Sequence, residues 1–485
     1  MSPAMLYGAF ALYGLFGTLV AAMARRGVTG QVESYFLANR RLGGVVSALS
    51  YAAATYSAFM MVGLAGLTYR GGVGALGFEF IYLAGLSLVA FFGPHFWRAG
   101  HRWRLVSPAE LLAVRYASPV LGMVVAGASV LFLIPYSSAQ LTGVALLMEG
   151  MSHGAIPFQV GLLLAAALSV AWAWMGGLKS VAWTQAVQAL FTMGTALFVT
   201  GVVLARVGGL GGLFARLAQD APELLVVPGN GYFSWQTFLG LSLPWFFFAL
   251  SNPQVSQRLF APRDLGVMRC MLLGFLAFGF IYTLTSILWG FAGRVLLPGL
   301  DNPDLVTPQL LGSGYVPPVA ALLAMVGIMA AAIDTVNPIL LTLSSMVARD
   351  LFRPLRPQAD DRAQLVVGKV AILAIGVLAL LFANLRAGLV AVLSVASSAG
   401  LLVTVPALIG AFYWQRGTAA GALAGIVAGG AVVVVMQFTG LRPLGLWPGV
   451  WGLTVSAALF VGVSLLTRPE ATRAREFAVL ARQPA

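Results

Sequence analysis

The chain has 485 residues, of which 60% are hydrophobic and only 9% are charged. Soluble domains are roughly 45–50% apolar and about 25% charged, so this composition excludes a soluble protein and indicates a polytopic membrane protein. The net charge of +13 does not predict a nucleic-acid partner, because the basic residues are scattered over short loops rather than clustered with aromatic residues.

Thirteen apolar runs follow one another along the chain, each close to the roughly 20 residues that cross a bilayer as a helix. The first run is too long and lacks the basic start of a cleaved signal peptide. No segment between the runs is long enough for a soluble domain, so residues 1–485 are expected to form one transmembrane transporter domain. In chain order the runs lie at about residues 5–24, 43–69, 74–97, 118–149, 156–176, 182–206, 234–257, 267–296, 316–348, 364–385, 388–413, 418–440 and 446–467.

The basic residues predict how these spans are oriented, because loops inside the cell carry an excess of Lys and Arg. With the N-terminus outside and the C-terminus inside, 22 of the 28 Lys and Arg residues fall inside, Arg25 and Arg26 among them. The six that fall outside are Arg70, Arg206, Arg216, Arg294, Arg386 and Arg442. This asymmetry favours thirteen spans with opposite ends of the chain on opposite sides.

Two of the runs contain residues that interrupt a helix. In the second run, nine of the twelve residues from Ser47 to Ala58 are Ala, Ser or Thr, and several glycines follow. The seventh run contains Pro244 and the pair Asn252 and Pro253. Interrupted helices at matching positions of two halves are typical of secondary transporters built from inverted repeats. The alternative is close helix packing, which small residues also allow.

The two interrupted runs lie five spans apart, so each opens a five-helix half of the chain. The sequence therefore predicts an all-α membrane protein with a 5+5 inverted repeat and two broken helices. The core repeats are expected at about residues 43–206 and 234–413, with extra helices at 5–24, 418–440 and 446–467.

Acidic residues are scarce within the spans. Only Glu79 and Asp334 are expected well inside the hydrocarbon, and Glu149 lies at the end of a span. A central charge costs roughly 2.5–3.5 kcal/mol on insertion scales, so such residues are functional candidates.

The segment "MAAAIDTVNPILL" concentrates polar groups on one side of a helix. Ala331, Asp334, Thr335 and Pro338 share a face at i, i+3, i+4 and i+7. Pro338 has no N–H, so the carbonyl of Asp334 loses its helical partner. A carboxylate, a hydroxyl and a free carbonyl are hard oxygen donors of the kind that alkali and alkaline-earth cations take. The alternative is a kink whose polar groups satisfy one another.

No other residues suggest a metal centre or a disulfide. Cys270 is the single cysteine, and His95, His101 and His153 lie far apart near span ends. Apart from a transported cation, no bound metal is expected.

Several motifs resemble those of the sodium/solute symporter family, and the resemblance runs from about Val32 to Leu466. It implies the inverted-repeat fold first seen in the leucine transporter and sodium-coupled symport of a small organic solute. The motifs are "ESYFLANRRLG" (33–43), "SPAELLAVRY" (107–116), "AQLTGVALLMEG" (139–150), "GGLKSVAWTQAVQ" (176–188), "NPQVSQRLFAPRD" (252–264) and "MAAAIDTVNPILLTLSSMVARDLFRP" (329–354).

The resemblance also implies a central sodium site. Its ligands would be the backbone carbonyls of Ala53, Tyr56 and Ala331 and the side chains of Asp334 and Thr335. The family usually has Ser followed by Ser or Thr at the last two positions. In this chain the neutral hydroxyl of the first is replaced by a carboxylate.

A second departure from the family lies in the sixth span. Where the family commonly reads Thr-Asp, with the Asp linked to sodium release or to a second sodium, this chain has Gln185. Positions 337 and 338, which help to bind a second ion in some members, are Asn337 and Pro338. We therefore expect one sodium ion per cycle. Proton-coupled symport on the same fold remains the alternative.

The solute is expected near the midplane, between the broken spans. Glu79 matches a Glu of sugar- and proline-transporting members, although it could instead be a structural anchor, and the aromatic "WFFF" could instead face lipid. The candidate lining residues are Ser57, Phe59, Met60, Glu79, Gln140, Trp245 and Phe248.

Three residues at the expected solute site indicate which class of substrate is transported. The sugar-type pattern needs Gln and Asn where this chain has Met60 and Trp245, and the proline-type pattern has Asp where this chain has Thr55. An apolar, aromatic pocket suits a solute with a hydrocarbon part. A monocarboxylate, a pantothenate-like acid or an amino acid is therefore expected rather than a sugar.

Other classes of protein fit less well. An enzyme would need an activated nucleophile or a metal cluster, and a channel would need a filter or rings of pore charges. A transport-like sensor would carry a signalling domain, and the chain ends shortly after its last span. We expect no enzyme, and a multi-pass protein of the plasma membrane, specifically a prokaryotic inner membrane.

Overall fold

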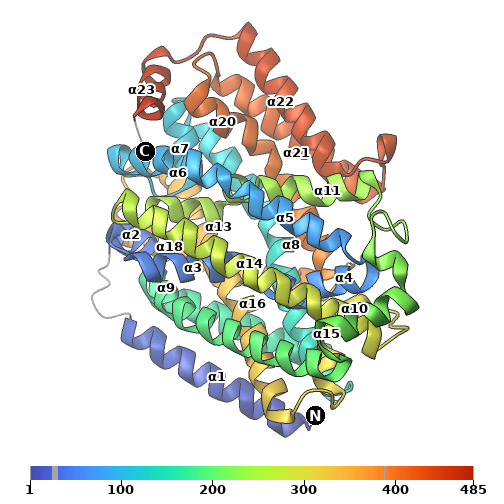
Figure 1. Ribbon diagram of the computed structural model, residues 1–485. Helices are drawn as coiled ribbons and strands as arrows, with labels where there is room; N and C mark the ends of the chain where they lie inside the picture. Colours follow the sequence, from blue (N-terminus) through green and yellow to red (C-terminus); the bar gives the residue numbers. More distant parts are fainter. Residues whose placement is uncertain (1, 25–30, 387, 484–485) are drawn as a thin grey trace.

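The computed structural model describes residues 2–24, 31–386 and 388–483, and within them the chain is all-α, as expected (Figure 1). The one β-type contact there is an isolated parallel bridge between Leu42 and Pro262. Arg25 and Arg26, which the expected topology places inside, lie outside the described residues. The expected orientation in the membrane stays a prediction.

Most of the expected spans are single long helices or nearly continuous pairs. Gly177 adopts a positive φ of 59° within α9, so this helix is two spans joined at a kink. In chain order the long elements are α1 (Pro3–Ala24), α5 (Gly74–Gly85) with α6 (Ser87–Trp103), α8 (Pro119–Met151), α9 (Phe158–Val207), α14 (Leu265–Leu296), α16 (Pro318–Met346), α18 (Asp361–Ala383), α19 (Val390–Leu401) with α20 (Val405–Tyr413), α21 (Ala419–Thr439) and α22 (Pro448–Leu466).

Twelve of the thirteen expected spans have the length and composition to cross a membrane. Among the described residues, eleven helical segments pass on their own, and α3 (Gly44–Thr55) adds a twelfth together with the helical segment Phe59–Gly71. The expected seventh span is instead three short helices, α11 (Trp235–Phe246), α12 (Phe248–Ser251) and α13 (Pro253–Ser256).

The second span is broken where its sequence predicts. α3 ends at Thr55, Tyr56 is extended (φ −85°, ψ 95°), and the chain resumes at a bend of 52° as the π-helix η2 (Phe59–Leu64) and then α4 (Ala65–Gly71). A π-helix leaves carbonyls without their usual partners. Here the carbonyl of Met60 accepts a bond from the Ser286 hydroxyl, and the carbonyl of Met61 accepts one from the Thr307 hydroxyl.

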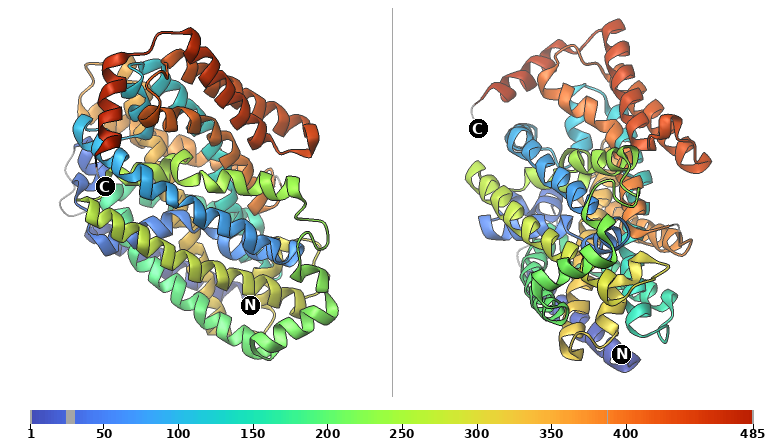
Figure 2. Two further views of the ribbon diagram at one scale, coloured as in Figure 1. Left: turned by 45° about the horizontal axis from the view of Figure 1, so that its top comes forward. Right: turned by 45° about the vertical axis from the view of Figure 1, so that its right-hand side comes forward.

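The seventh span breaks at Asn252, whose backbone is extended (φ −88°, ψ 110°) directly before Pro253 starts α13. The Asn252 amide donates to the Ser398 hydroxyl of α19 at 3.3 Å. Both broken spans lie inside the bundle, whereas α1 flanks it on one side and the pair α21 and α22 flanks it on the opposite side (Figures 1 and 2). This agrees with extra helices outside a core, and the inverted repeat itself stays a prediction.

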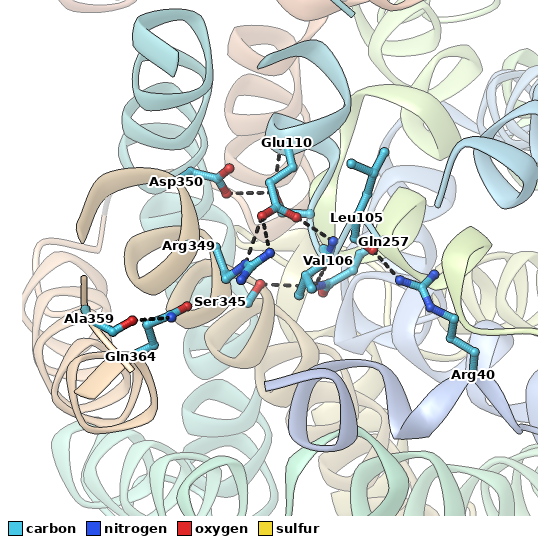
Figure 3. Close-up of polar contacts among 11 residues, drawn as sticks. Arg40, Leu105, Val106, Glu110, Gln257, Ser345, Arg349, Asp350, Ala359 and Gln364 are labelled. Carbon is cyan, nitrogen blue, oxygen red and sulfur yellow. Dashed lines mark hydrogen bonds and ion pairs between the residues drawn. The ribbon is translucent and has the colours of Figure 1, made fainter. Parts of the chain in front are cut away.

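A polar cluster lies at the end of the bundle that the expected topology places inside the cell (Figure 3). Gln257, just after the broken seventh span, donates to the carbonyl of Val106 at 2.7 Å and to Ser345 of α16 at 3.0 Å. Arg349 forms an ion pair of 2.8 Å with Glu110 of α7 (Pro108–Arg115). These bonds join the seventh span, α7 and α16 at that end.

At the other end, the loop between α14 and α16 is tied to the start of α19. Asp304, in the 3-10 turn η5 (Pro303–Leu305), is 2% exposed, and its carboxylate accepts a bond of 2.7 Å from the backbone N–H of Val390. Burial raises the pKa of the Asp304 carboxyl to about 7, and the bond from Val390 opposes that rise.

Asp304 should therefore make the stability of the protein depend on pH. The folded state binds this proton up to about pH 7, whereas an unfolded chain releases it near pH 4. Because the folded-state pKa is the higher one, the free energy of unfolding should fall from about pH 4 to pH 7 by about 3–4 kcal/mol on account of this group.

We expect Asp304→Asn, which does not titrate, to lose less thermal stability than the wild type over that interval. Unfolding temperatures in detergent at pH 4, 5, 6 and 7 measure the difference. Asp301→Asn, an exposed neighbour in the same loop, is the matched control. Parallel profiles for the wild type and Asp304→Asn would contradict the assignment.

Candidate functional site

Three of the expected ion ligands come together where α3 meets α16. The Thr335 hydroxyl lies 3.1 Å from the carbonyl oxygen of Ala331 and 3.4 Å from that of Ala53. All three residues are buried. This small group of neutral oxygens, which we call the oxygen triad, has the donor chemistry that an alkali cation takes.

Local structure explains why these oxygens are available. Ala331 and Thr335 lie one turn apart on α16, so they share a face. Ala53 lies in the last turn of α3, where carbonyls lack helical partners because the helix stops. Tyr56, the remaining expected carbonyl ligand, follows that helix end with extended backbone, and its role stays a prediction.

The carboxylate of Asp334 faces α9, next to the oxygen triad along the chain. Asp334 is 1% exposed, and one amide atom of Gln188 lies 2.5 and 2.6 Å from its two oxygens. Because an ionised carboxylate only accepts hydrogen bonds, this atom must be the amide nitrogen. The other amide atom lies 3.4 Å from the Tyr13 hydroxyl of α1, which then donates to it.

The backbone carbonyl of Asp334 lacks its usual helical partner, as the sequence predicts. Pro338 supplies no N–H to it, and the side-chain amide of Gln185 donates to it instead. Positions 185 and 334 therefore lie side by side. The Asp that the family commonly has on the sixth span is Gln185 in this chain. A different carboxylate, that of Asp334 on the ninth span, belongs to the residue beside it.

Sequence reasoning missed a buried cation at this site, Arg258. It is 5% exposed and is the second residue of the 3-10 helix η4 (Gln257–Phe260), which follows the broken seventh span. Its guanidinium donates to the carbonyl and hydroxyl of Ser50 and to the Gln185 side chain, the last at 2.9 Å. Arg258 and Asp334 lie within range of each other's charge. Its place directly after an apolar run was the available signal.

Glu79 of α5 forms the centre of a second buried group. It is fully buried, and neither carboxylate oxygen has a well-formed hydrogen bond within the described residues. The Trp245 indole is close enough to interact with it. A buried carboxyl that lacks well-formed hydrogen bonds within the described residues has acceptor capacity left for a ligand.

Aromatic rings from four elements cluster around Trp245, which lies beside this carboxyl. Trp245 of α11 lies 5.1 Å between ring centroids from Phe59 of η2 and 5.1 Å from Phe248 of α12. Phe78 and Tyr82, from the same helix as Glu79, lie 5.9 and 6.2 Å from Trp245. The rings of Phe59, Trp245 and Phe248 are all buried and so face the protein, not lipid.

The other expected lining residues lie around the break in the second span. The Ser57 hydroxyl accepts a bond of 3.2 Å from the N–H of Phe59, and Met60 follows in η2. Gln140 of α8 is buried with both amide atoms unpartnered in the part of the chain that the structure describes. One turn on, Gly143 packs so closely on Ala58 that an added Cβ would lie 2.9 Å from it, so this face of α8 meets the break.

Tyrosine hydroxyls, which sequence reasoning also missed, belong to the same buried group. Tyr82 and Tyr56 have buried hydroxyls without hydrogen bonds within the described residues. Tyr56, Tyr82 and Tyr136 all lie within range of the charge of Glu79. Their positions depend on how α5 and α8 pack against the break, which no local pattern encodes.

Comparisons with known proteins agree on one family and one fold. The family model described as "Sodium:solute symporter family" matches residues 35–429. The sodium/pantothenate symporter of Escherichia coli K12 is 28% identical over 92% of this chain and 93% of its own length. The sodium/proline symporter of the same organism is 26% identical, over 97% and 95%.

A solved structure shares the fold over almost the whole chain. It is a substrate-bound, outward-open Na⁺-coupled sialic acid symporter, which aligns with a TM-score of 0.80 at 20% identity and covers 96% of this chain and 98% of its own. The expected symporter fold is confirmed by this match.

Proposed function

The chain belongs to the sodium:solute symporter family, and we propose that one sodium ion, held at the oxygen triad beside Asp334, drives uptake of a small organic acid or amino acid. The protein is a sodium-coupled symporter rather than an enzyme, and it is a multi-pass protein of the plasma membrane. The ion residues and the substrate class are the parts that we propose.

The oxygen triad offers a simple way for the ion to act on the fold. Its oxygens come from α3 and α16, so a sodium ion bound there holds the two helices together. A ligand can shift the balance between two conformations only as far as it binds one of them more tightly. Sodium therefore favours the conformation in which α3 and α16 are close, and in that conformation the adjoining break carries the solute pocket.

Asp334 supports a single coupling ion. It is the one carboxylate that we place beside the triad, while Gln185, Asn337 and Pro338 stand where second-ion ligands occur in some members. An ion at the triad would feel the charge of Asp334 whether or not the carboxylate binds it directly.

The buried group around Glu79 favours a solute that donates hydrogen bonds and has a hydrocarbon part. An ammonium, amide or hydroxyl donor would satisfy the unpartnered oxygens of Glu79. A cationic nitrogen would also interact favourably with the ring faces of Phe59, Tyr82 and Trp245. An amino acid or an amide- and hydroxyl-bearing acid meets these demands better than a plain monocarboxylate, and the relatives named for proline and pantothenate transport agree with this.

Uptake into proteoliposomes tests the proposal. We expect neutral amino acids and a pantothenate-like acid to be accumulated against their own gradient when sodium is outside, with little accumulation when choline replaces sodium. Reversal potentials should give one sodium ion per solute.

Four outcomes would count against it. Full activity in choline at acid pH indicates proton coupling, and two sodium ions per solute contradict the single site. Equilibration without accumulation indicates a channel, and no uptake of any solute indicates a sensor.

A further inference from the structure

We propose that Arg258 is a buried countercharge that weakens sodium binding at the oxygen triad and thereby allows the ion to leave. The inference rests on the ion site proposed above. Arg258 would be a positioning residue in this role, because it acts on the ion through its charge and through Ser50 and Gln185, not as a ligand.

Arg258 is buried without a carboxylate bound to it in the part of the chain that the structure describes. No carboxylate oxygen lies within ion-pair distance of it among the described residues, where the ion pairs all involve other side chains. Its terminal nitrogens bond instead to neutral oxygens of Ser50 and Gln185, and its Nε has no hydrogen-bond partner in the described part of the chain. A buried charge is costly unless it is compensated, so this placement calls for an explanation.

Both bonding partners lead to the ion site. Ser50 lies on α3 one turn before Ala53, so the guanidinium sits beside the helix end that gives the triad its carbonyl. Gln185 accepts from Arg258 with one amide atom and donates with the other to the carbonyl of Asp334. Arg258 and Asp334 are thus separated by a single side chain.

The charges then oppose one another in a definite way. Without sodium, Arg258 and Asp334 compensate each other across Gln185. When sodium binds, one negative and two positive charges share a desolvated region, so the ion is attracted by Asp334 and repelled by Arg258. A site with Asp334 alone would hold sodium more tightly and release it more slowly, because affinity changes appear mostly in the rate of release.

Charge substitution separates this role from a structural one. Arg258→Gln should lower the sodium concentration for half-maximal uptake by about tenfold and should also slow turnover at saturating sodium. Arg258→Lys keeps the charge and should leave the sodium response within about twofold of the wild type. Loss of packing alone predicts the opposite for Arg258→Gln, a weaker sodium response.

A second variant keeps the proposal testable if Arg258→Gln does not fold. Gln185→Glu places a negative charge within reach of the guanidinium and should likewise lower the half-saturating sodium concentration. Arg115→Gln is the matched control, because Arg115 is fully buried but bonds to the carbonyls of Ala411 and Trp414 at another place. It should leave the sodium response unchanged.

Thr335→Ala distinguishes the two proposals. If Thr335→Ala raises the half-saturating sodium concentration while Arg258→Gln and Gln185→Glu fail to lower it, the countercharge is wrong and the ion site stands. If Thr335→Ala leaves sodium dependence unchanged in folded protein, the ion site itself is wrong. Tighter sodium binding in Arg258→Gln and Gln185→Glu, with wild-type behaviour in Arg258→Lys, supports the countercharge.

Discussion

Asp334→Asn should raise the sodium concentration for half-maximal uptake about 10- to 100-fold, the factor expected when a unit charge is removed several ångströms from an ion at an effective dielectric near 20. We expect protons and sodium ions to compete for this one carboxylate in the wild type. Acid pH should therefore weaken the apparent sodium affinity, and high sodium should overcome that effect. Asn offers an oxygen but no titrating group, so the variant should lose this pH dependence.

Two further substitutions define what the charge does. Asp334→Ser restores the usual residue of the family and should leave a weaker sodium site that is largely independent of pH. Asp334→Glu keeps the charge and should retain the competition. Uptake is measured at several pH values over a range of sodium concentrations. Wild-type sodium affinity and pH dependence in Asp334→Asn would show that the carboxylate is structural only.

Glu79→Gln should raise the solute concentration for half-maximal uptake about 10- to 100-fold, because hydrogen bonds to a charged partner are worth about 1.5–3 kcal/mol. Trp245→Ala should act in the same direction through lost ring contacts. In both variants the sodium dependence at saturating solute should change far less, since neither side chain belongs to the oxygen triad.

The neighbouring Phe246→Ala provides the control for the solute pocket. Phe246 adjoins Trp245 on the same short helix but is only half-buried, so its removal should leave the solute response near that of the wild type. Unchanged solute concentrations in both Glu79→Gln and Trp245→Ala, with normal amounts of inserted protein, would move the binding site elsewhere.

Helical periodicity made much of the ion site predictable. Ala331 and Thr335 fall on one face in any helix, and Pro338 frees a carbonyl wherever it stands in a helix interior. The small residues before Tyr56 predicted the break in the second span. These are local rules, and the structure confirms the geometry that they predict, although the ion that the site is proposed to bind stays untested.

The partners of Asp334 could not be predicted in the same way. Gln188 lies about 150 residues earlier in the chain and Tyr13 earlier still, so their approach depends on how α1, α9 and α16 pack. A glutamine has no pattern of its own that marks it as a neighbour of a carboxylate. The role of Arg258 was not predicted for a related reason. An arginine at the end of an apolar run is normally interpreted as an anchor at the membrane surface.

The polar cluster at the end of the bundle that the expected topology places inside should make the transport rate depend on temperature. Opening that end would break the bonds of Gln257 and Arg349 together (Figure 3), and water can replace them only once the gap has formed. Breaking hydrogen bonds before new ones are made gives a barrier that is mostly enthalpic. We therefore expect the transport cycle to slow steeply on cooling at its inward step, while binding from the opposite side is much less affected.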